Sequence, residues 1–327
     1  MMKSSQMTEV AILLSPYHQQ SAVNGLLDLF QIANLYAVKF AQDKHHIVRV
    51  TQWRTSSAKT QTMECVSDTH PEGKKSDPDF IIIPPSLNNI ISAEDSKTWT
   101  PWILKGHSKG SIICSICSGA FLLGETGLLD GRPTTTHWFF NDQFKQRFPK
   151  TLVDTDKILI DDGDIITVGG LMAWVDLGLS LVDRLLGPTI MIQTAQFLLV
   201  DPNGREQRHY SHFTPVMNHG DESILKAQHW LQKNTKNELN ITVLADKSGL
   251  SERTFLRRFN KATGLNPTAY CQKLRVSKAR ELLEFTKKNV EQIAWDVGYE
   301  DPGAFRKVFH KVMGLTPGEY RHKFHMR

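Results

Sequence analysis

The sequence has 327 residues, with 39 Lys and Arg against 34 Asp and Glu and a hydrophobic content of 40%. This length suits about two domains. Residues 221–327 carry 20 basic against 12 acidic side chains, a net charge of +8, whereas the remainder carries 19 against 22, so nucleic acid is favoured as a partner of the C-terminal part and not of the rest.

The sequence has no features of a secreted or membrane protein. Residues 10–14 are too few for the apolar core of a signal peptide, and charged residues interrupt the apolar segment 171–186. The four cysteines form no evenly spaced disulfide framework: Cys65, Cys114, Cys117 and Cys271. We therefore expect a cytoplasmic protein in a reducing compartment, with no membrane partner.

Strands and helices are predicted to alternate in the first 190 residues, which is typical of a parallel sheet covered on both faces. The clearest strand, residues 79–83, is a continuous apolar run that ends at Pro84. The other predicted strands are residues 9–15, 48–53 and 110–116 with an edge strand and loop in 59–75, and the predicted helices are residues 23–40 and 99–109. We predict an α/β domain with a doubly wound, mostly parallel, flavodoxin-like sheet.

The turn after residues 110–116 has the pattern of a nucleophile elbow. Cys117 follows the strand, and the small residues Ser118 and Gly119 allow a sharp reversal into a helix. A thiol at a helix N-terminus is expected to have a lowered pKa, and ligands bind at such strand ends. The simpler alternative is that Cys117 is only a small apolar residue in a tight turn. Cys114 and Cys117 could also form half of a metal site, but no second Cys or His pair lies nearby in the sequence to complete it.

Short motifs continue from this turn through the rest of the domain. They are Ser115-x-Cys117-x-Gly119-Ala120-x-x-Leu123, Gly127-Leu128-Leu129-Asp130-Gly131-Arg132, Thr136-His137-Trp138, Phe148-Pro149, Asp162-Gly163 and Thr167-x-x-Gly170 with Asp176. They resemble the class I glutamine amidotransferase-like (PfpI-type) domain, in the form that precedes an AraC-type module in GlxA-type transcriptional regulators. The resemblance implies an amidotransferase-like sensor domain over residues 8–190.

The resemblance also shows where the sequence departs from hydrolytic relatives. In those relatives, the elbow cysteine works with a histidine and with an acidic residue of the first helix. Cys117 and His137 are the matching candidates, but Ala22 stands where the acid is usual. We therefore predict no enzyme activity, no cofactor and no metal, with Cys117 and His137 as vestigial catalytic residues. The predicted role of the site is to bind an effector through Cys117, Ser118, His137 and Trp138.

Residues 191–220 are predicted to connect this domain to a second one, residues 221–327. The turn sequence Asp201-Pro202-Asn203-Gly204 lies in this segment. His209 and His212 are three residues apart, but we interpret them as solvated linker residues rather than as metal ligands.

Residues 240–320 contain the same sequence pattern twice. Ala245 and Gly249 recur 49 residues later as Ala294 and Gly298. After one inserted residue, six more identities recur at a spacing of 50: Phe255/Phe305, Phe259/Phe309, Gly264/Gly314, Leu265/Leu315, Pro267/Pro317 and Tyr270/Tyr320. Eight identities in register indicate an internal duplication.

Each copy is predicted to be a helix, a turn and a helix. The predicted N-caps are Asn240, Ser251, Asn289 and Asp301, and the predicted C-terminal caps are Gly249 and Gly298. The paired phenylalanines of each second helix face a core, so its basic side chains face outward. The alternative for a single copy is a helical bundle with a solvated basic face, and the duplication favours two helix-turn-helix units.

The outward positions differ between the copies. Ser251, Arg253, Thr254 and Arg257 are the predicted DNA-binding residues of the first copy, and Gly303, Ala304, Arg306 and Lys307 are those of the second. Arginine can bind guanine O6 and N7 in the major groove. Gly303 and Ala304 have no such groups, so we expect the second copy to contribute mainly phosphate contacts and shape.

Four motifs of this region are Ser251-x-Arg253-Thr254-x-x-Arg257-Arg258-Phe259, Thr263-Gly264-x-x-Pro267, Ile293-Ala294-x-x-x-Gly298-Tyr299 and Gly314-x-Thr316-Pro317-x-x-Tyr320-Arg321. They resemble the AraC/XylS DNA-binding domain over residues 223–324. The resemblance implies an all-α domain that binds double-stranded DNA in two successive major grooves, and a homodimer.

The sequence thus supports three hypotheses of function. The first is a sequence-specific DNA-binding transcriptional regulator controlled by a small-molecule effector in the N-terminal domain. The second is a cysteine-dependent enzyme of the amidase or hydratase type fused to a DNA-binding module, and the third is a DNA-binding protein whose first domain only dimerises. Ala22 in place of the acid favours the first hypothesis over the second.

Overall fold

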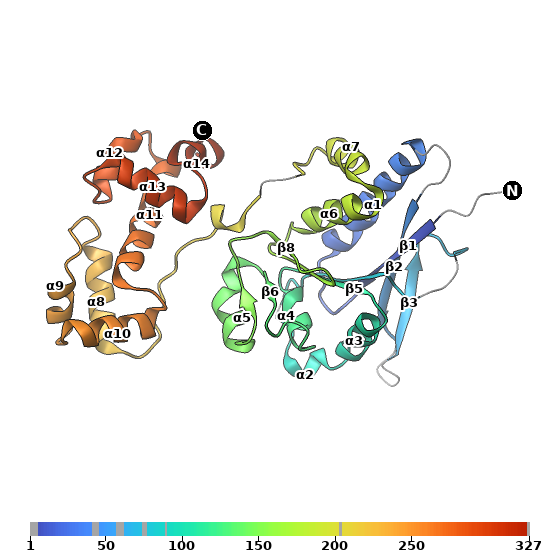
Figure 1. The fold of residues 1–327 in the computed structure, drawn as a ribbon, viewed down its shortest axis with the longest axis horizontal. Coiled ribbons are helices and arrows are strands. Elements are labelled where there is room, and N and C mark those ends of the chain that lie inside the picture. Colours follow the sequence, from blue (N-terminus) through green and yellow to red (C-terminus); the bar gives the residue numbers. More distant parts are fainter. Residues whose placement is uncertain are drawn as a thin grey trace. The chain divides into compact units, whose positions relative to one another are not determined.

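The computed structural model describes residues 6–40, 46–56, 62–73, 77–88, 90–202 and 205–325 (Figure 1). The chain divides into two compact units between Gln207 and Arg208. The first unit is α/β and the second is all-helical, so the predicted fold classes are confirmed. None of the helices within the described ranges combines the length and apolar character needed to cross a membrane.

A seven-stranded sheet with the strand order β3-β2-β1-β4-β5-β9-β8 is the centre of the first unit. Neighbours from β2 to β9 are parallel, whereas the edge strands β3 and β8 are antiparallel to theirs. The strands are β1 (Gln6–Leu13), β2 (His46–Thr55), β3 (Met63–Asp68), β4 (Phe80–Ile83), β5 (Ile112–Ile116), β8 (Leu159–Asp161) and β9 (Ile165–Val168), with β6 (Pro133–Thr134) and β7 (Leu152–Val153) forming a separate pair. Strand β3 is the predicted edge strand, and part of the predicted segment 59–75 lies outside the described residues.

Helices cover both faces of this sheet because its central strands are apolar on both sides. Val10 and Ile12 pack in a cluster with α1 (Gln20–Phe40), α6 (Trp174–Leu186) and α7 (Pro188–Leu198). Ala11 and Leu13 pack in the cluster of the opposite face (Figure 1). Its helices are α3 (Thr100–Ser108), α4 (Gly119–Gly124) and α5 (Asn141–Arg147), with the short α2 (Ala93–Ser96) before them. This alternation confirms the doubly wound arrangement.

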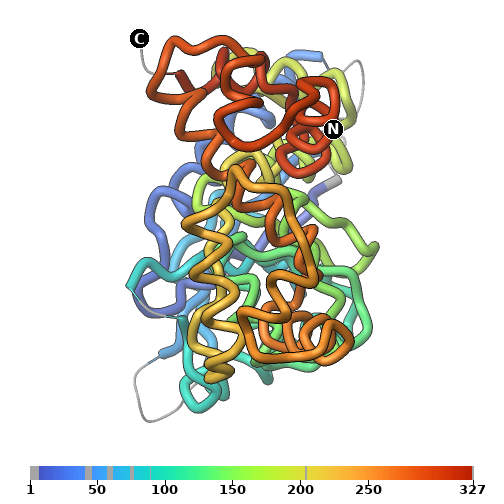
Figure 2. The backbone as a smooth tube through the Cα atoms, turned by 90° about the vertical axis from the view of Figure 1, so that its left-hand side faces the viewer, coloured from blue at the N-terminus to red at the C-terminus, as the bar shows by residue number. Residues whose placement is uncertain are grey.

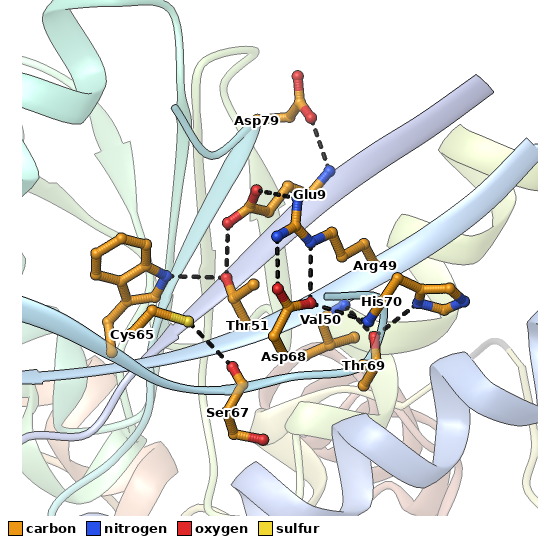
Figure 3. A network of polar contacts seen from close by, with 11 residues as sticks. Glu9, Arg49, Val50, Thr51, Cys65, Ser67, Asp68, Thr69, His70 and Asp79 are labelled. Atoms are coloured by element: carbon orange, nitrogen blue, oxygen red, sulfur yellow. Dashed lines mark hydrogen bonds and ion pairs between the residues drawn. The ribbon is translucent and has the colours of Figure 1, made fainter. Parts of the chain in front are cut away.

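Buried charges join the edge strand β3 to β2 and β1 (Figure 3). Arg49, whose side chain is 4% exposed, donates to the two carboxylate oxygens of Asp68 at 2.9 and 2.5 Å, and it lies 3.3 Å from Glu9. Thr51 donates to the other oxygen of Glu9 at 2.8 Å. Burial raises the pKa of Glu9, whereas the Arg49 guanidinium lowers the pKa of Asp68. The four side chains satisfy one another, so we interpret the network as structural.

In its described residues, the second unit has seven α-helices and two hydrophobic cores. They are α8 (Glu222–Lys233), α9 (Ile241–Lys247), α10 (Glu252–Thr263), α11 (Pro267–Phe285), α12 (Val290–Asp296), α13 (Pro302–Met313) and α14 (Pro317–Phe324). Helices α8–α10 and α12–α14 lie at opposite ends of the long helix α11 (Figure 2). The two predicted helix-turn-helix units are α9–α10 and α12–α13.

The predicted caps account for the ends of these helices, with one exception. Asn240 accepts from the backbone N–H of Val243, and Asn289 forms a complete capping box. Asp301 accepts from the first two free N–H groups of α13. Ser251 occupies the N-cap position of α10, but its hydroxyl donates to the Thr254 hydroxyl at 3.0 Å and makes no cap hydrogen bond.

The predicted connector, residues 191–220, is divided between the two units. Helix α7 packs against α1 and α6 through Met191, Ala195 and Leu198, which lie on one helix face. Residues up to 207 belong to the first unit and residues from 208 to the second. Asn203 and Gly204 of the predicted turn lie outside the described residues.

Candidate functional site: elbow, pocket and reading helices

The predicted elbow after β5 is present. Cys117 has φ +53°, a conformation that is uncommon outside glycine, and its N–H donates to the Val168 carbonyl at 2.7 Å. Thr136 donates to the Cys117 carbonyl at 2.8 Å and so holds the strained residue from the other side. A side chain at Gly119 would lie 2.5 Å from the Ile83 carbonyl oxygen. Only glycine therefore allows α4 to begin so close to β4.

The predicted lowering of the Cys117 pKa is wrong. The residue is 2% exposed, and burial raises the pKa of the thiol to about 11. The backbone N–H groups of Ser118 and Gly170 favour the thiolate, but their effect is smaller than the cost of removing the charge from water. Cys117 is therefore a protonated thiol at neutral pH.

His137 does not complete a catalytic pair. Its Nδ1 accepts from the backbone N–H of Phe139 at 3.1 Å, and its ring packs on Trp138 and Phe140. Burial lowers the pKa of His137. Within the described part of the chain, no hydrogen bond joins His137 to Cys117. Ala22, at the position of the missing acid, is fully buried in the core under α1.

A pocket of about 320 Å³ opens beside the elbow, at the carboxyl ends of three neighbouring strands. Its lining includes Ser15 and Tyr17 after β1, Pro84 and Ser86 after β4, Ser118 and Gly119 after β5, and Ile90, Ile91, Asp95, Trp99 and Leu122. Of the four predicted effector-binding residues, Ser118 lines this pocket, whereas Cys117, His137 and Trp138 are absent from the described lining. Asp95 is the only charged residue among the described lining residues.

The sequence predictions missed Tyr17, Asp95 and Trp99 as pocket residues. Tyr17 has φ +59° and is 66% exposed, so the chain turns sharply just after β1. The rule that ligands bind at the carboxyl ends of parallel strands would have identified the residues after β1 and β4. No motif marks Asp95 and Trp99, because they come from a separate helical segment that folds over the strand ends.

The second candidate site is formed by α10 and α13, which we call the reading helices. Phe255 and Phe259 of α10, and Phe305 and Phe309 of α13, are fully buried. The predicted DNA-binding residues are on the opposite faces: Ser251, Arg253, Arg257, Ala304, Arg306 and Lys307 are exposed, and Thr254 and Gly303 are half-buried. The helices thus orient the predicted residues toward solvent, as contact with DNA requires.

Ion pairs divide the arginines of the reading helices into two groups. Arg258 donates to both carboxylate oxygens of Asp221, the N-cap of α8, at 2.8 and 2.6 Å and lowers the pKa of that carboxyl. Arg306 is paired with Glu291 of α12. Arg253 and Arg257 form no hydrogen bond or ion pair with any of the described residues. Helix α10 therefore presents two uncommitted guanidinium groups, and α13 presents none among its described arginines.

Within the described part of the chain, no three metal-ligating side chains come together. His209, which is buried, and His212 therefore do not belong to a cluster of candidate ligands there.

Two family models match the chain. The DJ-1/PfpI family matches residues 8–184, and a helix-turn-helix domain matches residues 244–323. Both predicted resemblances are thereby confirmed.

The matching regulators extend over both units. The HTH-type transcriptional regulator CdhR of Pseudomonas aeruginosa is 28% identical over 221 residues, which cover 67% of this chain and 66% of that protein. The HTH-type transcriptional regulator GlxA of Rhizobium meliloti is 28% identical over 217 residues, which cover 65% of this chain and 66% of that protein. The chain thus spans just under two thirds of the length of these relatives. The solved structure of Drosophila melanogaster DJ-1beta is 18% identical with a TM-score of 0.45, covering 60% of this chain and 100% of that one.

Proposed function

Because the chain belongs to the DJ-1/PfpI family and carries a helix-turn-helix domain of the AraC type, we propose that it is a sequence-specific DNA-binding transcriptional regulator. The observation that carries the proposal is the pair of uncommitted guanidinium groups, Arg253 and Arg257, on the exposed face of α10. Arginine on a recognition helix can donate to O6 and N7 of guanine in the major groove. Helix α13, with Gly303 and Ala304, contacts phosphates in the next major groove.

A selection experiment with the full chain tests this proposal. The chain is incubated with a pool of random DNA duplexes, and the bound fraction is sequenced after several rounds. We expect one enriched motif, present twice if the protein is a homodimer. Its affinity should fall by about tenfold or more between 50 and 200 mM salt, because Lys and Arg displace counterions from phosphates. Binding without any enriched motif would refute sequence-specific recognition.

We further propose that the pocket beside Cys117 binds a small-molecule effector and performs no catalysis. The buried protonated thiol, the separate contacts of His137 and the apolar Ala22 all oppose nucleophilic chemistry. The pocket is mostly apolar with aromatic walls at Tyr17 and Trp99, and its one charged group in the described lining is the Asp95 carboxylate. This lining favours an effector with an apolar body and an amine or another hydrogen-bond donor.

Ligand-dependent melting of the full chain tests the effector proposal. A panel of small amines and amino acids is compared with carboxylic acids of similar size. We expect a stabilising amine whose effect is lost in Asp95→Asn and kept in Glu94→Gln, since Glu94 is on the same short helix but pairs with Lys97 outside the pocket. An effect that survives Asp95→Asn unchanged would contradict binding in this pocket.

A further inference from the structure

Residues 210–219, which we call the strap, belong to the predicted connector and are bound along the second unit. The strap lies beside α11 (Figure 1) and contacts α8, α11 and α14. These helices contribute to the two hydrophobic cores, one shared with α9 and α10 and the other with α12 and α13. It has no helix or strand of its own, so its position depends on side chains of the surrounding helices.

Gln228 of α8 holds the strap beside the core that α8 shares with α9 and α10. The side chain is fully buried, and its Nε2 donates to the Val216 carbonyl at 2.9 Å and to the Tyr270 hydroxyl at 3.1 Å. Its Oε1 is 2.7 Å from Nε2 of His219. The ring of Phe213 packs edge-to-face on Tyr270, with 5.2 Å between the centroids.

Arg280 of α11 holds the other end of the strap beside α14, which shares a core with α12 and α13. The residue is 5% exposed, and its Nε donates to the Tyr320 hydroxyl at 2.7 Å. Its Nη1 donates to the carbonyl of Ser211. The ring of Tyr210 packs edge-to-face on Phe324 at 5.4 Å between centroids.

The two anchors repeat one arrangement. Tyr270 and Tyr320 are equivalent residues of the duplication, 50 positions apart, and both are fully buried. Each hydroxyl is bound by a buried polar side chain that also donates to a carbonyl of the strap. The strap is thus held once beside each of the two hydrophobic cores, each time by a buried side chain that also binds a tyrosine hydroxyl.

We propose that the strap, through Gln228 and Arg280, fixes the spacing of the reading helices α10 and α13. Helices α8–α10 and α12–α14 have separate hydrophobic cores. They are joined by α11 and by the α8–α9 loop, where Lys236 pairs with Asp296 and approaches Gly298, and the strap is a further connection between them. Arg275 of α11 also donates to the carbonyls of Thr235 and Asn237 at 2.8 Å, and this Arg275 brace joins α11 to the α8–α9 loop. A fixed spacing lowers the ordering cost when both helices bind successive grooves. That consequence rests on the proposed DNA-binding function, whereas the fixed spacing does not.

Distances between spin labels on the two reading helices test the strap without DNA. Labels at Lys261→Cys and Lys311→Cys occupy equivalent exposed positions, in a full chain with the exposed Cys65 replaced by serine. We expect one narrow distance distribution, which becomes at least about twice as broad in Tyr210→Ala/Phe213→Ala as two ring contacts are lost. The control Trp295→Ala removes an exposed aromatic ring outside the strap and should leave the width unchanged.

Two results would overturn the strap proposal. An unchanged width in Tyr210→Ala/Phe213→Ala would show that α11 and the Arg275 brace suffice. Loss of helical circular dichroism in the same variant would show that the segment belongs to the core and does not merely position the units.

Binding to the selected DNA then tests the consequence for function. The variant should bind the two-groove site about tenfold more weakly than the parent and tolerate a changed spacing, while its affinity for one half-site stays within about twofold. Failure of the parent to bind any specific DNA would refute the proposed function, and the label distances would still decide the role of the strap.

Discussion

At Cys117, backbone geometry and burial have opposite effects on the thiol. The sequence pattern predicted the elbow correctly, because the small residues after β5 are a local signal. The pKa could not be predicted in the same way, since it depends on residues far along the chain that exclude water from the thiol. Thr136 and Val168, which hold Cys117 in place, are 19 and 51 positions away.

Alkylation of Cys117 should therefore be slow and strongly pH-dependent. A pKa of about 11 leaves on the order of one thiol in ten thousand ionised at pH 7. The rate of carboxamidomethylation, followed by mass spectrometry at pH 7, 8 and 9, should rise about tenfold per pH unit. Cys65, which is exposed, is the internal control and should react much faster. Rapid reaction of Cys117 that is independent of pH above 7 would favour the enzyme hypothesis.

Gln207 is a residue whose importance no local pattern indicates. Its side chain is 2% exposed, and Nε2 lies 2.8–3.0 Å from the oxygens of Thr135, Thr136 and Lys157. Its Oε1 accepts from the backbone N–H of Trp138 at 2.9 Å. Thr136 also donates to the carbonyl of Cys117, so Gln207 supports the segment that holds the elbow.

Replacing Gln207 by alanine should destabilise the first unit by about 2–4 kcal/mol, because it leaves buried donors and acceptors without partners. Calorimetry of the full chain measures the effect. Gln196→Ala, an exposed glutamine of α7, is the matched control and should change stability by less than about 0.5 kcal/mol. Equal, small effects of both substitutions would mean that water replaces the amide of Gln207 without cost.

Among the elements, the two helix-turn-helix units each have a glycine after their first helix, but the surroundings of the two glycines differ. Gly249 has φ +66°, and a Cβ atom added there would meet no other atom within 4 Å. Gly298 has φ +88°, and a Cβ atom there would lie 2.6 Å from the Lys236 carbonyl oxygen. The sequence predicted both residues as helix caps. The close approach of the α8–α9 loop to Gly298 is a tertiary contact that no cap pattern contains.

Gly298→Ala should therefore cost more stability than Gly249→Ala. The left-handed conformation alone costs about 1–2 kcal/mol for alanine, and the backbone clash at Gly298 should add about 1–3 kcal/mol. The calorimetric transition of the second unit measures both variants, and each is the other's control. Equal losses would show that the loop moves away at no cost.

The strap and α7 illustrate which elements sequence patterns could not place. Residues 191–198 have an apolar helical face, but the polar residues that follow favoured a connector. The strap residues bind Gln228, Arg280 and the rings of Tyr270 and Phe324, which lie 9 to 114 positions away. A segment without regular structure that is held by distant side chains has no periodicity to detect.

For the whole molecule, the two units carry different chemistry that the charge distribution already indicated. The slightly acidic first unit contains an apolar pocket with one carboxylate in its described lining, and the basic second unit exposes Arg253 and Arg257. The two copies differ more than the sequence predicted, because Arg306 is paired with Glu291. Of the DNA-binding residues predicted on α13, Lys307 is then the cation without an ion pair to a described residue. We therefore propose that α10 is the helix that recognises bases.

The affinity of Arg253→Ala and Arg257→Ala for the selected site, compared with random DNA, tests this assignment most directly. Each substitution should weaken binding to the selected site by about 1–3 kcal/mol and binding to random DNA far less, since a base contact is lost. Arg54→Ala, an exposed arginine of the first unit that pairs with Glu64, is the control and should change neither affinity. Equal losses on both DNAs, or no loss on the selected site, would contradict base recognition by α10.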